Sequence, residues 1–106
     1  MREYKINILP IAIEDIINIQ ADITKRYNDA FNADKVVNRI FDGINTLASS
    51  PKRAEIRLVI SELDLRFLKI GKYTAIYYVN DMDSTVKIYG VFYSRRDFTK
   101  IIEDRI

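Results

Sequence analysis

Residues 63–93 read LDLRFLKIGKYTAIYYVNDMDSTVKIYGVFY, and this stretch decides the fold. Within each of its apolar runs the side chains alternate between two faces, which is the period of a β-strand. The runs cover residues 63–70, 73–79 and 85–93. A Gly71-Lys72 turn and the polar segment 80–84 separate them, and short turns of this kind join antiparallel neighbours. The stretch therefore predicts a three-stranded meander.

The middle run is apolar or aromatic on both faces, so it is expected to be a central strand covered on both sides. One face carries Tyr73, Ala75, Tyr77 and Val79, and the other carries Thr74, Ile76 and Tyr78. In the last run the same alternation places Val86, Ile88, Gly90 and Phe92 opposite Lys87, Tyr89, Val91 and Tyr93.

The flanking sequence predicts one more strand and three helices. Residues 2–9 alternate like a half-buried strand, while residues 11–27 and 32–48 have the period of amphipathic helices, with Asn32 as the N-cap of the second. A short break makes these two helices a hairpin. Ser94-Arg95-Arg96-Asp97 has the spacing of a capping box that opens a last helix. Residues 52–62 fit a strand or a short helical turn.

Together these elements predict an α+β fold. Their order is β-α-α-β-β-β-α, with an antiparallel sheet packed against the helical hairpin. A chain of 106 residues without a linker is expected to form a single domain over residues 1–106.

Three residue types are missing, namely histidine, cysteine and tryptophan. This excludes a Ser-His-Asp triad, a cysteine nucleophile, a His/Cys zinc site and a disulfide. Acid–base chemistry would have to use Asp, Glu, Lys, Arg or Tyr, whose ordinary pKa values lie far from 7. No glycine cradle for a nucleotide is present, and Asp81-x-Asp83 fits a turn better than a calcium loop. We therefore expect neither a metal nor a cofactor.

No apolar run approaches the length of a membrane span, and the N-terminus lacks the apolar core of a signal peptide. We therefore expect a cytoplasmic protein without a membrane partner.

Positive charge is concentrated in the second half of the chain. Residues 52–106 contain 11 Lys and Arg against 8 Asp and Glu, whereas residues 1–51 contain 6 against 7. These cations either bind phosphate or an acidic partner, or they form an ordinary solvated face. The tyrosines in this half either stack on unpaired nucleic-acid bases or pack the sheet against the helices. Glu14-Asp15 is either a carboxylate pair or the acidic first turn of a helix.

Two segments carry a family resemblance: Leu65-Arg66-Phe67-Leu68-Lys69-Ile70-Gly71-Lys72-Tyr73-Thr74-Ala75-Ile76-Tyr77-Tyr78-Val79 and Val91-Phe92-Tyr93-Ser94-Arg95-Arg96-Asp97. They resemble the Val-Gly-x-Tyr-Arg turn, the Tyr-x-Val strand and the Arg-Arg-Asp ending that are typical of the RelE/ParE superfamily of bacterial type II toxins. Element order and length match as well. The resemblance implies a toxin held inactive by a cognate antitoxin. One branch of the family cleaves messenger RNA on the ribosome, and another poisons DNA gyrase.

The resemblance also implies a set of site residues. For RNA cleavage, the catalytic candidates are Arg66, Arg95, Arg96 and Tyr93, because cations would hold the scissile phosphate and stabilise its developing charge. The candidates for target binding are Lys52, Arg53, Lys69, Lys72 and Tyr73. Tyr73, Tyr93 or Glu62 would have to activate the 2′-hydroxyl.

The chain departs from the ribonuclease branch at two places. Thr74 stands where that branch usually carries Arg, and no Tyr follows Tyr93. The long helical hairpin and the Ser-Arg-Arg-Asp ending are closer to the ParE-like branch. Gyrase poisoning is therefore placed ahead of messenger RNA cleavage. The alternative is a non-catalytic or degenerate member that binds nucleic acid or protein. An apolar face of the hairpin suits a homodimer as well as a toxin–antitoxin hetero-oligomer.

Overall fold

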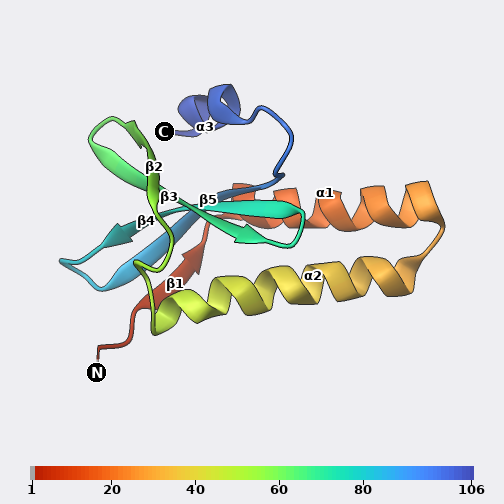
Figure 1. Ribbon diagram of the computed structural model, residues 1–106, viewed down its shortest axis with the longest axis horizontal. Coiled ribbons are helices and arrows are strands. Elements are labelled where there is room, and N and C mark those ends of the chain that lie inside the picture. Colours follow the sequence, from red (N-terminus) through yellow and green to blue (C-terminus); the bar gives the residue numbers. More distant parts are fainter. Residues whose placement is uncertain (1) are drawn as a thin grey trace.

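The computed structural model describes residues 2–106 and confirms the α+β class (Figure 1). Four strands follow the hairpin, one more than the meander predicted from residues 63–93, because the stretch left open at residues 52–62 contributes β2. The elements are β1 (Lys5–Ile8), α1 (Pro10–Tyr27), α2 (Ala30–Asn45), the 3-10 helix η1 (Thr46–Ala48), β2 (Ile56–Ile60), β3 (Leu63–Ile70), β4 (Tyr73–Asn80), β5 (Thr85–Tyr93) and α3 (Thr99–Arg105).

The five strands form one sheet in the order β1-β5-β4-β3-β2. Strands β2 to β5 are an antiparallel meander, as their short turns require. The N-terminal strand β1 is different, because it adds to the far side of β5 in parallel, with Lys5 beside Thr85. The first and last strands of the chain are therefore neighbours.

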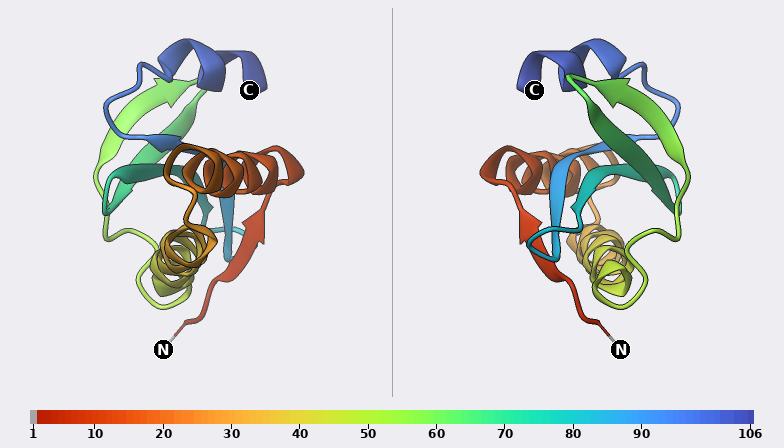
Figure 2. Two further views of the ribbon diagram at one scale, coloured as in Figure 1. Left: turned by 90° about the vertical axis from the view of Figure 1, so that its right-hand side faces the viewer. Right: turned by 90° about the vertical axis from the view of Figure 1, so that its left-hand side faces the viewer.

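Each face of the sheet has its own apolar core. Helices α1 and α2 cover one face, where Ile16, Ile40 and Ile44 pack on Ala75 and Tyr77 of β4. Helix α3 covers part of the other face, where a second core forms from Leu65, Ile76, Phe92, Phe98 and Ile102. Figure 2 shows α3 and α2 at opposite ends of the molecule. The prediction that β4 is covered on both sides is confirmed.

A β-bulge interrupts β5. Ile76 pairs with Gly90 and Tyr77 pairs with Ile88, so Tyr89 is an extra residue in β5. The bulge reverses the alternation beyond this point, and Val91 packs on the hairpin side while Phe92 faces α3. The predicted faces of β5 are therefore wrong after Tyr89, because a strict period of two allows no inserted residue.

Local polar contacts shift two helix starts from their predicted positions. Asp29, and not Asn32, caps α2, because its Oδ1 accepts a hydrogen bond from the Asn32 backbone N–H at 2.9 Å. The predicted capping box at residues 94–97 does not form. The Ser94 N–H donates to the Lys72 carbonyl at 2.8 Å and so continues the sheet, and α3 begins only at Thr99.

No helix within residues 2–106 combines the length and apolar character needed to cross a bilayer.

Candidate functional site

The structure divides the predicted site residues between two ends of the sheet. Arg66 lies opposite Tyr77, whereas Tyr93 lies opposite Tyr73, at the end that carries the β3–β4 turn. Four residues of an extended strand separate these pairs, a distance of about 13 Å. Lys52 and Arg53 belong to the Arg66 end, and Lys69, Lys72, Arg95 and Arg96 belong to the other end. The four predicted catalytic residues are therefore not gathered at one point.

Arg66 anchors the loop that precedes β2. Its guanidinium Nη1 donates to the Ala54 carbonyl at 2.7 Å and to the Lys52 carbonyl at 3.4 Å. The hydroxyl of its cross-strand neighbour Tyr77 donates to the Pro51 carbonyl at 2.8 Å. Arg66 thus serves the structure of the loop, a role that the sequence did not indicate.

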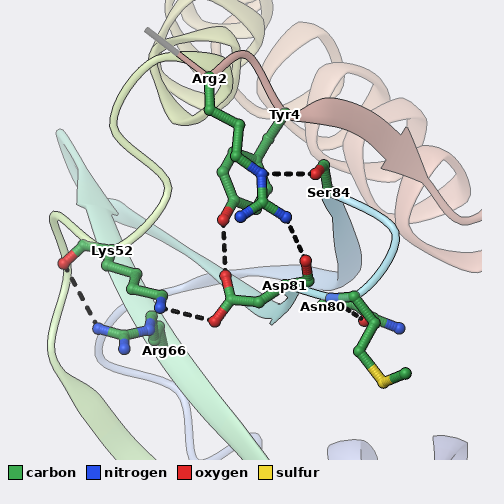
Figure 3. Close-up of polar contacts among 8 residues, drawn as sticks. Arg2, Tyr4, Lys52, Arg66, Asn80, Asp81 and Ser84 are labelled. Atoms are coloured by element: carbon green, nitrogen blue, oxygen red, sulfur yellow. Dashed lines mark hydrogen bonds and ion pairs between the residues drawn. The ribbon is translucent and has the colours of Figure 1, made fainter.

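Asp81 joins three segments at the same end of the sheet (Figure 3). Its carboxylate accepts from Lys52 Nζ at 2.7 Å and from the Tyr4 hydroxyl at 2.6 Å, while Arg2 donates to its backbone carbonyl and to Ser84 Oγ. The bond from Lys52, followed by that from Tyr4, lowers the pKa of the Asp81 carboxyl. The bond to Asp81 in turn raises the pKa of the Tyr4 phenol. This network fixes Lys52, and Arg53 is held separately by Thr46 Oγ1 at 2.7 Å.

A small cavity of about 390 Å³ opens beside this network. Three carboxylates line it, those of Glu62, Asp64 and Asp81, with two cations, Lys52 and Arg66, that are already bonded. The carboxylates would repel a phosphate, so this cavity is a poor place to hold one. Within residues 2–106 no cluster of three or more acidic residues is arranged to hold a metal ion.

A larger groove of about 1110 Å³ lies at the other end, between the helical hairpin and the β3–β4 turn. We call it the hairpin groove. Its lining comprises Asp15, Asn18, Ile19, Asp22, Ile23, Arg26, Tyr27, Asn32, Val36, Arg39, Ile40, Ile70, Gly71, Lys72, Tyr73, Val91, Phe92, Tyr93 and Arg96. The groove therefore brings together four of the predicted residues, Lys72, Tyr73, Tyr93 and Arg96.

Tyrosine rings form one wall of the hairpin groove. Tyr73 and Tyr93 meet edge to face, with ring centroids 6.0 Å apart. Burial, followed by the nearby Asp22, raises the pKa of the Tyr73 phenol. The phenol therefore stays protonated at neutral pH, which makes it a hydrogen-bond donor and a poor general base.

Cations from three elements surround the groove. Arg39 of α2, Lys72 of the β3–β4 turn and Arg96 after β5 have exposed side chains, and none of them makes an ion pair within residues 2–106. Arg26 differs, because it pairs with Asp22 at 3.2 Å. Sequence reasoning missed Arg39 and Tyr27, since only the packed hairpin brings them beside the β3–β4 turn.

Asp15 forms the inner end of the groove, where it binds Arg105. Because α1 begins at Pro10, Asp15 lies beyond the first helical turn and turns toward β5. It accepts from the Val91 N–H at 3.0 Å and from two nitrogens of Arg105. The two interpretations offered for Glu14-Asp15, a carboxylate pair and a helix-start acid, are therefore both wrong for Asp15.

Solved structures of other proteins share this architecture. The chain is similar to the chromosomal ParDE toxin–antitoxin system of P. aeruginosa, with a TM-score of 0.70 and 17% identity over 86% of this chain and 96% of that chain. It is similar to a RelBE toxin–antitoxin complex of Mycobacterium tuberculosis, with a TM-score of 0.66 and 17% identity over 88% and 93% of the two chains. An archaeal RelE–RelB complex from Pyrococcus horikoshii gives a TM-score of 0.63 and 20% identity over 90% and 99%.

At these identities the structural likeness establishes the fold. No curated protein matches the sequence. A family model described as the ParE toxin of the type II toxin-antitoxin system, parDE, matches residues 6–98. Because this match spans most of the chain, the chain belongs to the ParE toxin family of type II toxin–antitoxin systems.

Proposed function

We propose that this toxin stops growth by inhibiting DNA gyrase and does not cleave messenger RNA. One observation carries the choice, namely the separation of the predicted catalytic set. Arg66 is bonded to the loop carbonyls at one end of the sheet, while Tyr93, Arg95 and Arg96 lie at the other end. A gyrase inhibitor needs a binding surface, and it does not need these residues to meet.

RNA cleavage would require cations on the scissile phosphate and a base beside the 2′-hydroxyl. The two candidate bases other than Tyr93 are badly suited. The Tyr73 phenol has a raised pKa, and Glu62 lies in the exposed turn between β2 and β3. Tyr93 with Arg95 and Arg96 remains the only group of predicted catalytic residues that lie together, so these three define the test of the competing mechanism.

The proposed partner in the resting cell is a cognate antitoxin, as the family description implies. The similar structures from P. aeruginosa, M. tuberculosis and P. horikoshii are toxin–antitoxin systems or complexes. We propose a hetero-oligomer with this antitoxin, and an action on gyrase that places the free toxin in the cytoplasm.

A paired assay tests the mechanism. The purified toxin is added to a gyrase supercoiling reaction and, separately, to a translating extract whose messenger RNA ends are mapped. We expect blocked supercoiling and intact messenger RNA. Cleaved messenger RNA that becomes intact when Arg95 and Arg96 are both replaced by Ala would establish the ribonuclease mechanism and refute our proposal.

Growth in a susceptible host without the antitoxin gives a second readout. Induced wild-type toxin should slow growth, and co-expression of the antitoxin should restore it. Salt-dependent nucleic-acid binding without any growth defect would instead indicate the non-catalytic binding module.

A further inference from the structure

We propose that the hairpin groove is the surface that engages gyrase. Its occupant would be a protein segment that carries carboxylates around an apolar side chain. This inference rests on the proposed function and adds to it the contact surface and the chemistry of the recognised segment.

The charges of the groove set the first requirement on the occupant. Both carboxylates of the lining are already bonded, Asp15 to Arg105 and Asp22 to Arg26. Arg39, Lys72 and Arg96 have no such partner within residues 2–106, and each comes from a different element. Three cations left unpaired around one concavity favour an acidic occupant.

The floor of the groove sets the second requirement. Ile19 of α1 and Val36 of α2 are partly exposed there, above the buried side chains of Ile23, Ile40 and Ile70. Such a floor excludes water from an apolar side chain and stabilises it there. The volume of about 1110 Å³ exceeds the roughly 300–1,000 Å³ of ordinary small-molecule pockets, so the groove accommodates a segment of several residues.

The tyrosines add specificity for a polypeptide. The Tyr73 phenol keeps its proton at neutral pH and can donate to a backbone carbonyl. Tyr27 and Tyr93 flank it on the rim, with exposed rings that supply contact area at low entropic cost.

A protein segment fits better than a nucleic acid. The apolar side chains of the lining have no counterpart in a phosphodiester backbone. An acidic peptide suits such a groove better, because it presents apolar side chains beside its carboxylates.

Charge reversal tests the proposal in intact toxin with gyrase holoenzyme. Arg39→Glu and Lys72→Glu each reverse one charge of the groove, the first on α2 and the second in the β3–β4 turn. The matched control is Lys100→Glu, because Lys100 is an exposed cation of α3 outside the lining. Each groove variant should raise the toxin concentration for half-inhibition of supercoiling by roughly tenfold or more, and the control should stay within about twofold of wild type. Thermal unfolding and circular dichroism verify that all three variants fold.

The outcomes separate the two levels of the proposal. If wild-type toxin inhibits gyrase and Arg39→Glu and Lys72→Glu inhibit equally well, the groove is not the contact surface, although the proposed function stands. Equal losses in Lys100→Glu would also overturn the assignment, because they would show a general charge effect. If wild-type toxin leaves gyrase active, the proposed function fails and the assignment of the groove fails with it. Binding of a single-stranded oligonucleotide that is lost in Arg39→Glu would identify a nucleic-acid groove instead.

Discussion

Arg105, one residue before the end of the chain, forms a bidentate ion pair with Asp15 of the first helix. The two contacts measure 2.7 and 2.9 Å, and the side chains are only 16% and 13% exposed. Arg105 also donates to the Tyr89 carbonyl at 3.0 Å and lies over the Phe92 ring at 5.0 Å. This pair ties α3, α1 and the bulge of β5 together.

Replacing Arg105 with Met should lower the free energy of unfolding by about 3–5 kcal/mol, because it leaves the largely buried Asp15 carboxylate without its cation and with only the Val91 N–H as a donor among the described residues. Urea denaturation followed by circular dichroism measures the change. The matched control is Asp22→Asn, which removes the exposed Arg26–Asp22 pair and should cost only about 0.3–0.5 kcal/mol. Similar values for both variants would show that the Arg105 pair contributes no more than a surface contact.

Gly90→Ala should destabilise the fold by about 1–3 kcal/mol through overpacking. A Cβ at this position would lie 2.5 Å from Cε2 of Phe92 and 2.8 Å from Nη1 of Arg105. The comparison is Gly71→Ala, where a Cβ meets nothing within 4 Å but φ is +59°, which costs about 1–2 kcal/mol by strain alone. The double variant Gly90→Ala, Arg105→Met should lose less free energy of unfolding than the sum of the two single losses, because the guanidinium that meets the new Cβ is gone. A loss equal to that sum would argue against the clash.

Tyr77→Phe should cost about 1–3 kcal/mol, although the ring is kept. The lost hydroxyl leaves the Pro51 carbonyl without its donor in a part-buried setting. Hydrogen exchange should show faster opening of the segment around residues 51–55. Tyr78→Phe serves as the control, because the structure shows no side-chain hydrogen bond for Tyr78 among residues 2–106. Loss of stability in Tyr78→Phe alone would contradict this account.

Asp81→Asn should change the pH dependence of stability. The pKa of the Asp81 carboxyl is lowered in the folded state, so its contacts stabilise the fold above the unfolded pKa, and this contribution is lost as pH falls through the folded-state value. The difference in Tm between wild type and Asp81→Asn should therefore be constant from about pH 6 to 8 and shrink below about pH 4. Asp83→Asn is the control, since Asp83 makes no ion pair within residues 2–106.

The same network predicts an alkaline limit. The pKa of Tyr4 is raised in the folded state, so the Tyr4–Asp81 bond contributes fully below the unfolded pKa and is lost as pH rises through the raised value. Tyr4→Phe should therefore lie closer to wild type above about pH 10 than at pH 7. A difference that grows with pH would have the wrong sign.

The fold was predictable because its signals are local. The alternation of side chains on both sides of Gly71-Lys72 specifies two strands, and the helical period of residues 11–48 specifies the hairpin. Both patterns involve only residues that are close in sequence. Strand β2 was left open because Ile56, Leu58, Val59 and Ile60 fit a strand and a helical turn equally well until β3 pairs with them. The bulge at Tyr89 has no local signal strong enough to break the period of β5.

The site was less predictable because its contacts are distant in sequence. The sequence suggests that Arg66 is a free cation on a strand, but the two carbonyls that bind it belong to a loop 12 and 14 residues earlier. Asp15 meets Arg105 across 90 residues, and Arg39 comes to the groove only when the hairpin packs beside the β3–β4 turn. The residue types pointed to a cationic face, whereas packing decides which cations remain unpaired.

The parallel pairing of β1 with β5 also determines when the native sheet can form during synthesis. Residues 5–8 are synthesised well before residues 85–88, the strand with which they pair in the described part of the chain. The Asp15–Arg105 pair imposes a longer wait, because its two residues lie 90 positions apart. A contact of such high sequence separation is slow to close and is formed late. The nascent chain therefore cannot close its sheet until β5 has been made, and helix α1 cannot be tied to α3 until residue 105 has followed.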